Sequence, residues 1–228
     1  MALDDAAGWF GKLAMLGDFA SRRLPSEWVQ ACDGWLSDCV EASRRELGPR
    51  WPEVYLAAPA WRFAWGPGIA DERWWFGLLM PSCDSVGRYF PLVIAQARHQ
   101  PPNDRIALDH LELWWSHMAR AALQTLAEGA SLDAFEGELG QAPPWPGSGS
   151  RADVTQPQAV AGRERYAVAA GVSLSDAARD IAAAGLLRRL GGMSAWTPLR
   201  SAAEPGSLTL QAGLPPAAAF AQLLAGSW

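Results

Sequence analysis

A short polar turn between two apolar runs carries the side chains best suited to chemistry in this sequence. The run at 77–92 reads GLLMPSCDSVGRYFPL, and its turn holds four polar side chains, Ser82, Asp84, Ser85 and Arg88. Such groups cap turns and form ion pairs, or they present charge to a partner protein from a rigid sheet edge. A hydrolase would need a general base poised near neutrality, and the neighbouring sequence offers none.

Other candidate catalytic residues fail on spacing. His110 and His117 lie seven positions apart on one predicted helix, about 10 Å along its axis, so one metal ion cannot easily bridge them. Zinc needs three or four ligands at about 2 Å, and no Cys-x-x-Cys or His-Glu-x-x-His motif supplies the others. Cys39 and Arg45 have the spacing of a phosphatase loop, but their segment is predicted to be mid-helix. We therefore expect no catalytic residue, no metal site and no cofactor.

Composition indicates a folded protein with a large core. Half of the 228 residues are hydrophobic, and thirteen are tryptophan, a residue that usually packs in cores. The formal charge is −5, Lys12 is the only lysine, and no basic cluster exceeds a pair. A nucleic-acid partner is not expected, because phosphate-backbone binding needs a basic surface.

The sequence also predicts a cytoplasmic location. Charged residues and glycines interrupt residues 1–20, so they lack the pattern of a signal peptide. No run approaches the eighteen apolar residues of a transmembrane helix. The three cysteines, Cys32, Cys39 and Cys83, are too few and too scattered for a disulfide framework, so we expect reduced thiols.

Hydrophobic periodicity and turn residues predict the elements of the first 139 residues. We expect a short strand and a tight turn within 8–24, a helix over 25–47, strands within 54–65 and 74–97, a helix capped by Asn103 or Asp104 and ending near Gly129, and a helix over 131–139. Residues 140–158 are rich in proline, glycine and serine, so we expect a mobile loop or linker there.

The tail, 159–228, predicts a C-terminal α/β region packed on the same domain. We expect a strand around 166–170, a helix over 175–190, strands at 194–200 and 207–213, and a helix beginning at 215–216. Strands in antiparallel groups separated by long amphipathic helices are typical of the α+β class. The predicted fold is a mainly antiparallel sheet covered by helices in a layered sandwich.

Four blocks in the first hundred residues resemble the TagF (ImpM) family. They are GWFGKLAMLGDF at 8–19, DGWL at 33–36, APAWRF at 58–63 and GLLMPSCDSVGRYFPL at 77–92. Beyond residue 100 the similarity is weaker and general, as in GLPPAAAF at 213–220. Several spaced blocks in the right order are a more specific signal than any single short motif.

The resemblance implies a non-enzymatic, cytoplasmic, post-translational repressor of bacterial type VI secretion that acts by binding a forkhead-associated scaffold protein. It implies no cofactor. Charged residues in the matching blocks become candidates for the partner-binding surface: Lys12, Asp18, Arg62, Asp84 and Arg88. Two alternatives stay open, a hydrolase of unrecognised type using the turn at 84–88 and a structural subunit of the secretion apparatus.

Overall fold

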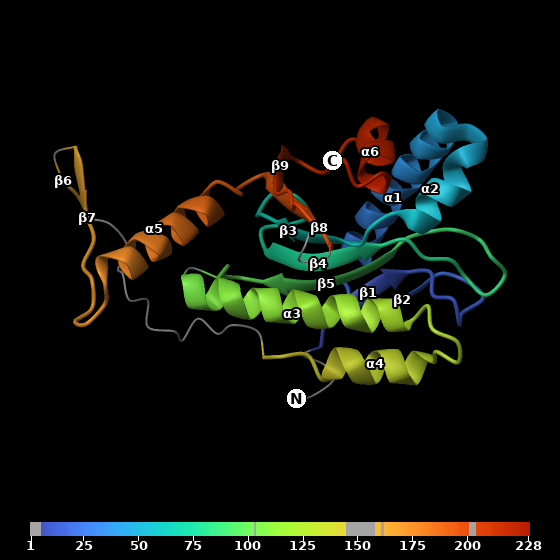
Figure 1. Cartoon of the computed structure of the whole chain (residues 1–228), viewed down its shortest axis with the longest axis horizontal. Helices are drawn as coiled ribbons and strands as arrows, with labels where there is room; N and C mark the ends of the chain where they lie inside the picture. The colour runs from blue at the N-terminus through green and yellow to red at the C-terminus, as the bar shows by residue number, and fades with distance from the viewer. Residues whose placement is uncertain (1–5, 103, 145–157, 161, 201–203) are drawn as a thin grey trace.

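A seven-stranded antiparallel sheet lies at the centre of the protein, with helices on both faces (Figure 1). The structure, a computed structural model, describes residues 6–102, 104–144, 158–160, 162–200 and 204–228. This architecture confirms the predicted fold class, an α+β sandwich built on an antiparallel sheet.

The sheet joins strands from both ends of the chain. Its order is β2-β1-β5-β4-β3-β8-β9, with bounds β1 Gly8–Gly11, β2 Ala20–Arg22, β3 Trp61–Trp65, β4 Trp74–Met80, β5 Leu92–Arg98, β8 Met193–Pro198 and β9 Thr209–Ala212. The tail contributes β8, which pairs with β3, and β9, which pairs with β8. Two short strands form a separate hairpin, β6 Gln158–Val160 and β7 Arg163–Arg165.

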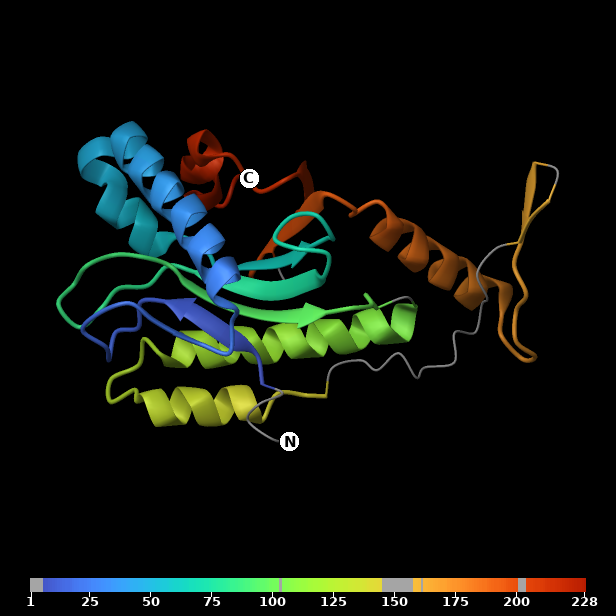
Figure 2. The ribbon, with the colours of Figure 1, turned by 180° about the vertical axis from the view of Figure 1, so that it is seen from behind.

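Helices cover the two faces of the sheet unequally. One face carries α1 Ser26–Leu47, α2 Trp51–Ala57 and α6 Phe220–Leu224, and the other carries α3 Arg105–Gln124 and α4 Leu132–Gly140. The remaining helix, α5 Leu174–Arg188, points away from the body towards the β6–β7 hairpin, as both views show (Figures 1 and 2).

Alternation along the strands assigns side chains to the two faces. Trp61, Phe63 and Trp65 of β3 pack towards α1, where Trp65 stacks on Trp28 at 5.5 Å between ring centroids. Gly77 of β4 lies opposite Phe63, and a Cβ on Gly77 would come within 2.3 Å of the Phe63 ring. Glycine at this position therefore leaves the space that the aromatic layer occupies.

Side-chain caps begin three helices close to where the sequence predicts them. Asp104 accepts a hydrogen bond from the Ala107 amide at 2.7 Å at the start of α3, and Ser131 accepts from the Ala134 amide at 3.2 Å at the start of α4. Ser173 does the same for α5. Such caps satisfy amides that have no partner inside the helix.

Three predicted elements were wrong in detail. Residues 51–57 form α2, whereas we expected a strand from 54, because Trp51 and Tyr55 stack four residues apart at 4.6 Å and both face the core. The segment 8–24 forms two strands joined by a longer loop, not one strand and a tight turn. The strand expected around 166–170 lies at Arg163–Arg165 instead.

Most of the predicted linker, 145–157, lies outside the described residues, so the expectation of mobility there stays a prediction. Among the described residues, no helix combines the length and apolar character needed to cross a membrane.

We predict that Cys39→Ser lowers stability without affecting any specific activity. Cys39 is fully buried on the sheet-facing stripe of α1, and burial, with a smaller effect from Asp38, raises the pKa of its thiol to about 12. A serine hydroxyl at this buried position would be removed from water without a compensating hydrogen-bond partner, which costs about 1–3 kcal/mol. Denaturant unfolding measures the change.

Cys83→Ser is the matched control, because Cys83 is only half-buried, and its effect should stay within about 0.5 kcal/mol. A loss of function in Cys39→Ser with unchanged unfolding would contradict the purely structural role.

Candidate partner-binding site at the end of the sheet

Two loops meet at one end of the sheet because of how β1 and β5 pair. The strands are antiparallel, with Gly11 opposite Leu92, so the loop 12–19 that leaves β1 lies beside the loop 81–91 that enters β5. The Ser82 hydroxyl donates to the Lys12 carbonyl at 2.7 Å, and the Ser85 amide donates to the Leu16 carbonyl at 2.8 Å. The two loops therefore form one connected unit.

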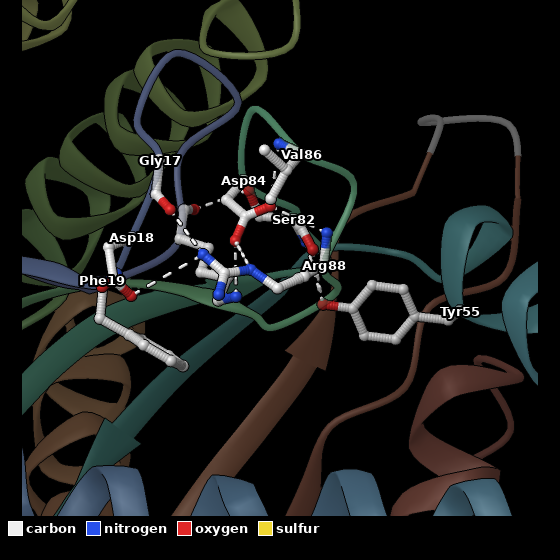
Figure 3. A network of polar contacts seen from close by, with 9 residues as sticks. Gly17, Asp18, Phe19, Tyr55, Ser82, Asp84, Val86 and Arg88 are labelled. Carbon is white, nitrogen blue, oxygen red and sulfur yellow. Dashed lines mark hydrogen bonds and ion pairs between the residues drawn. The ribbon is translucent and has the colours of Figure 1, made fainter.

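Asp84 is the centre of this unit (Figure 3). Its side chain is fully buried, and its Oδ2 accepts from Lys12 Nζ at 2.7 Å and from Arg88 Nε at 2.7 Å. Its Oδ1 accepts from the backbone amides of Val86 at 3.1 Å and Arg88 at 2.9 Å. One carboxylate thus closes its own turn and ties that turn to the first loop.

The surroundings of Asp84 hold the pKa of its carboxyl well below the usual range. Burial opposes ionisation, but the hydrogen bonds from Lys12, Arg88 and the Val86 amide all favour the ionised form and together outweigh it. A carboxylate with so low a pKa is a poor general base at neutral pH. The geometry suits Asp84 to positioning rather than to proton transfer.

Arg88 is held at the surface by groups beneath it. Its Nη2 donates to the Gly17 carbonyl at 2.5 Å and lies 4.0 Å from Asp18 Oδ1. The side chain remains 56% exposed, and that of Asp18 is 80% exposed. The guanidinium is therefore held by Asp84 and Gly17, and both charged groups are open to a partner.

Two apolar side chains accompany these charges. Val86 is 70% exposed and Phe19 is 45% exposed. The Phe19 ring packs edge-on against Phe90 at 4.8 Å, and Lys12 Nζ lies 4.7 Å from its centroid, so its orientation is defined. We call the four exposed residues Asp18, Phe19, Val86 and Arg88 the loop surface.

Tyr55 of α2 supports the turn from the interior, a role that sequence reasoning missed. Its hydroxyl donates to the Ser82 carbonyl at 3.0 Å and accepts from the Ser82 amide at 3.1 Å. Burial raises the pKa of the phenol, although the bond to Ser82 partly opposes the rise. The strand expected from residue 54 would not have directed Tyr55 towards Ser82. The four-residue spacing of Trp51 and Tyr55, which is typical of a helix, was the sequence signal that could have predicted this orientation.

Gly11 permits the close approach of the two loops. Its φ is +130°, and a Cβ there would lie 2.1 Å from the Pro91 carbonyl oxygen. Any larger residue would force the end of β1 away from the segment that leads into β5.

The structure separates the five residues predicted for partner binding. Lys12 and Asp84 are buried, whereas Asp18 and Arg88 are exposed above them. Arg62 does not join this unit, because it lies on β3 and forms an ion pair with Glu112 of α3. Among the residues that the structure describes, no group of three His, Cys, Asp or Glu side chains is arranged to hold a metal ion.

Comparison with known proteins identifies the family of the chain. A family model for the TagF N-terminal domain, described as type VI secretion system-associated, matches residues 8–142, more than half of the chain. The crystal structure of PA0076 from Pseudomonas aeruginosa PAO1 aligns with a TM-score of 0.73 and 35% identity over 97% of this chain and 94% of that chain. A search of curated proteins gave no significant match.

The fold and the family match define a protein associated with type VI secretion. The chain belongs to the TagF family, as the four sequence blocks predict. The loops at 12–19 and 81–91 both lie inside the matched region.

We predict that Asp84→Asn destabilises the protein in a pH-dependent way. The pKa of Asp84 is lower in the folded than in the unfolded state, where it is about 3.9, so its ionised form stabilises the fold above that pH. The stabilisation is lost as the pH falls through the folded-state pKa. The difference in unfolding free energy between wild type and Asp84→Asn should be constant above about pH 5 and shrink below about pH 4.

Denaturant unfolding at a series of pH values measures this difference. Asp109→Asn is the control, since Asp109 is exposed on α3 and forms an exposed ion pair with Arg105 four residues away, and its effect should be small throughout. A difference for Asp84→Asn that persists undiminished to about pH 2 would contradict the assignment.

Proposed function

We propose that this protein is a cytoplasmic, non-enzymatic repressor of type VI secretion that binds a forkhead-associated scaffold protein of the same apparatus. The loop surface is the proposed contact. Membership of the TagF family supports the association with secretion, and the repressor role and the scaffold are the parts that the proposal adds.

The observation that supports this proposal best is the arrangement of buried and exposed charges around Asp84. The buried Lys12–Asp84 pair lies beneath the loops, while Arg88 and Asp18 present opposite charges above it. Exposed charged groups held on rigid backbone lose little conformational freedom on binding, which favours specific recognition. Exposed Val86 and Phe19 add apolar area to the same loops.

Binding is a better proposal than catalysis for this site. The hydrolase alternative would use the turn at 84–88, but both Asp84 oxygens accept hydrogen bonds from the protein itself. Its low pKa also leaves it with little basicity at neutral pH. The same groups serve well as a rigid frame for a surface.

We predict that Val86→Asp and Asp18→Arg each weaken scaffold binding at least about tenfold and release secretion. Both side chains are largely exposed and neither bonds to the Asp84 carboxylate. Asp18→Arg removes the exposed 4.0 Å ion pair with Arg88, so thermal unfolding of both variants should change by less than about 1 kcal/mol. A misplaced charge at a complementary interface costs several kcal/mol. Binding is measured with purified proteins, and secretion in the native host carrying each variant.

Glu41→Arg is the matched control, because Glu41 is an exposed residue of α1 whose side chain is 70% accessible and far in sequence from both loops. If wild type does not bind the scaffold, the proposed partner is wrong. If wild type binds and both loop variants bind equally well, the partner stands but the loop surface is wrong. Capture of sheath or tube subunits alone would favour the structural-subunit alternative.

A further inference from the structure

An apolar cavity lies beside the last strand of the sheet, at the opposite edge from β2. Its volume is about 160 Å³, and it lies between α3, the end of α5 and the strands β3, β8 and β9. The side chains that shape it include Leu111, Trp115, Leu187, Leu190, Ala195 and Leu210. A space of about this volume is large enough for a group the size of a benzene ring.

The adjacent strand β9 has an open edge. Within the described residues β9 pairs only with β8, and every residue of Thr209–Ala212 is at least partly exposed. The other edge strand, β2, ends at Arg22. The next residue, Arg23, has a φ of +59° and bends the chain away from the strand direction. Charges and bends protect sheet edges from pairing with other chains, and β9 has no charged residue.

Two leucines, one exposed and one half-buried, connect this edge to the cavity. Leu208, just before β9, is 58% exposed and also lines the cavity, as Leu210 does. In a strand, residues two apart point to the same face. An added strand beside β9 would therefore point alternate side chains to the face that holds the cavity.

We propose that an extended segment of a partner protein docks here, pairing its backbone with β9 and placing one Leu- or Phe-sized side chain in the cavity. Backbone pairing supplies affinity and the cavity selects the side chain, as in other cases of strand addition. A second copy of this chain fits less well, because β9 has only four residues, and pairing two copies through it would involve far fewer residues than the roughly 20–30 a side of a stable dimer interface. The site shares no residue with the loop surface, so it stands independently of the scaffold proposal.

A displayed library of random heptapeptides selected on the full chain tests the inference. The enriched peptides should share one apolar residue at a fixed position and bind Ala195→Leu at least tenfold more weakly, since leucine would fill the cavity from β8. Ala182→Leu is the matched control, an exposed position on α5 outside the cavity lining, and it should bind like wild type. A bound peptide should also slow hydrogen exchange at the amides of Thr209–Ala212.

A second variant keeps the test decisive if Ala195→Leu fails to fold. Leu208→Lys changes an exposed side chain and adds charge at the edge, so it should fold and weaken the same peptides at least tenfold. The proposal is overturned if no peptide is enriched, if the enriched peptides bind both variants like wild type, or if β9 exchange is unaffected. It is also overturned if wild type dimerises through β9 while Leu208→Lys is monomeric, because the occupant is then a second copy.

Discussion

The candidate site depends on the hydrogen bonds and ion pairs that the ionised carboxylate of Asp84 forms. This carboxylate is buried, and it binds an ammonium group from one loop and a guanidinium and two amides from the other. A buried charge is stable only when such partners compensate for its lost hydration. Because all these partners converge on one group, removing it would leave Lys12 buried without its carboxylate and Arg88 without its closest anionic partner.

The sheet makes that convergence possible. Antiparallel pairing of β1 with β5 brings the two loops to one end, and Gly11 allows their backbones to approach to a distance that no side chain would permit. On the sheet face, Gly77 leaves room for Phe63 within an aromatic layer that α1 covers. Small residues at a few positions thus determine how closely the large ones pack.

The loops beside β1 and β5 and the edge strand β9 offer different kinds of surface. The loop surface carries fixed charges beside two apolar side chains and suits a folded partner. The β9 edge offers unpaired backbone and an apolar cavity, which suit an extended segment. A TagF-family protein with both surfaces would be able to contact two partners, or two parts of one partner, at the same time.

The residues of this chain by themselves predicted the α+β class, most helices and strands, and the four blocks that place it in the TagF family. Helix caps such as Asp104 and Ser131 and the alternation in β3 are local signals, so they are readable without a structure. Burial is not local: nothing in the sequence separates Lys12 and Asp84, which lie inside, from Asp18 and Arg88, which lie outside. The pairing of β8 with β3, the role of Tyr55 and the cavity beside β9 were decided only by the tertiary structure, because each depends on contacts between segments far apart in the chain.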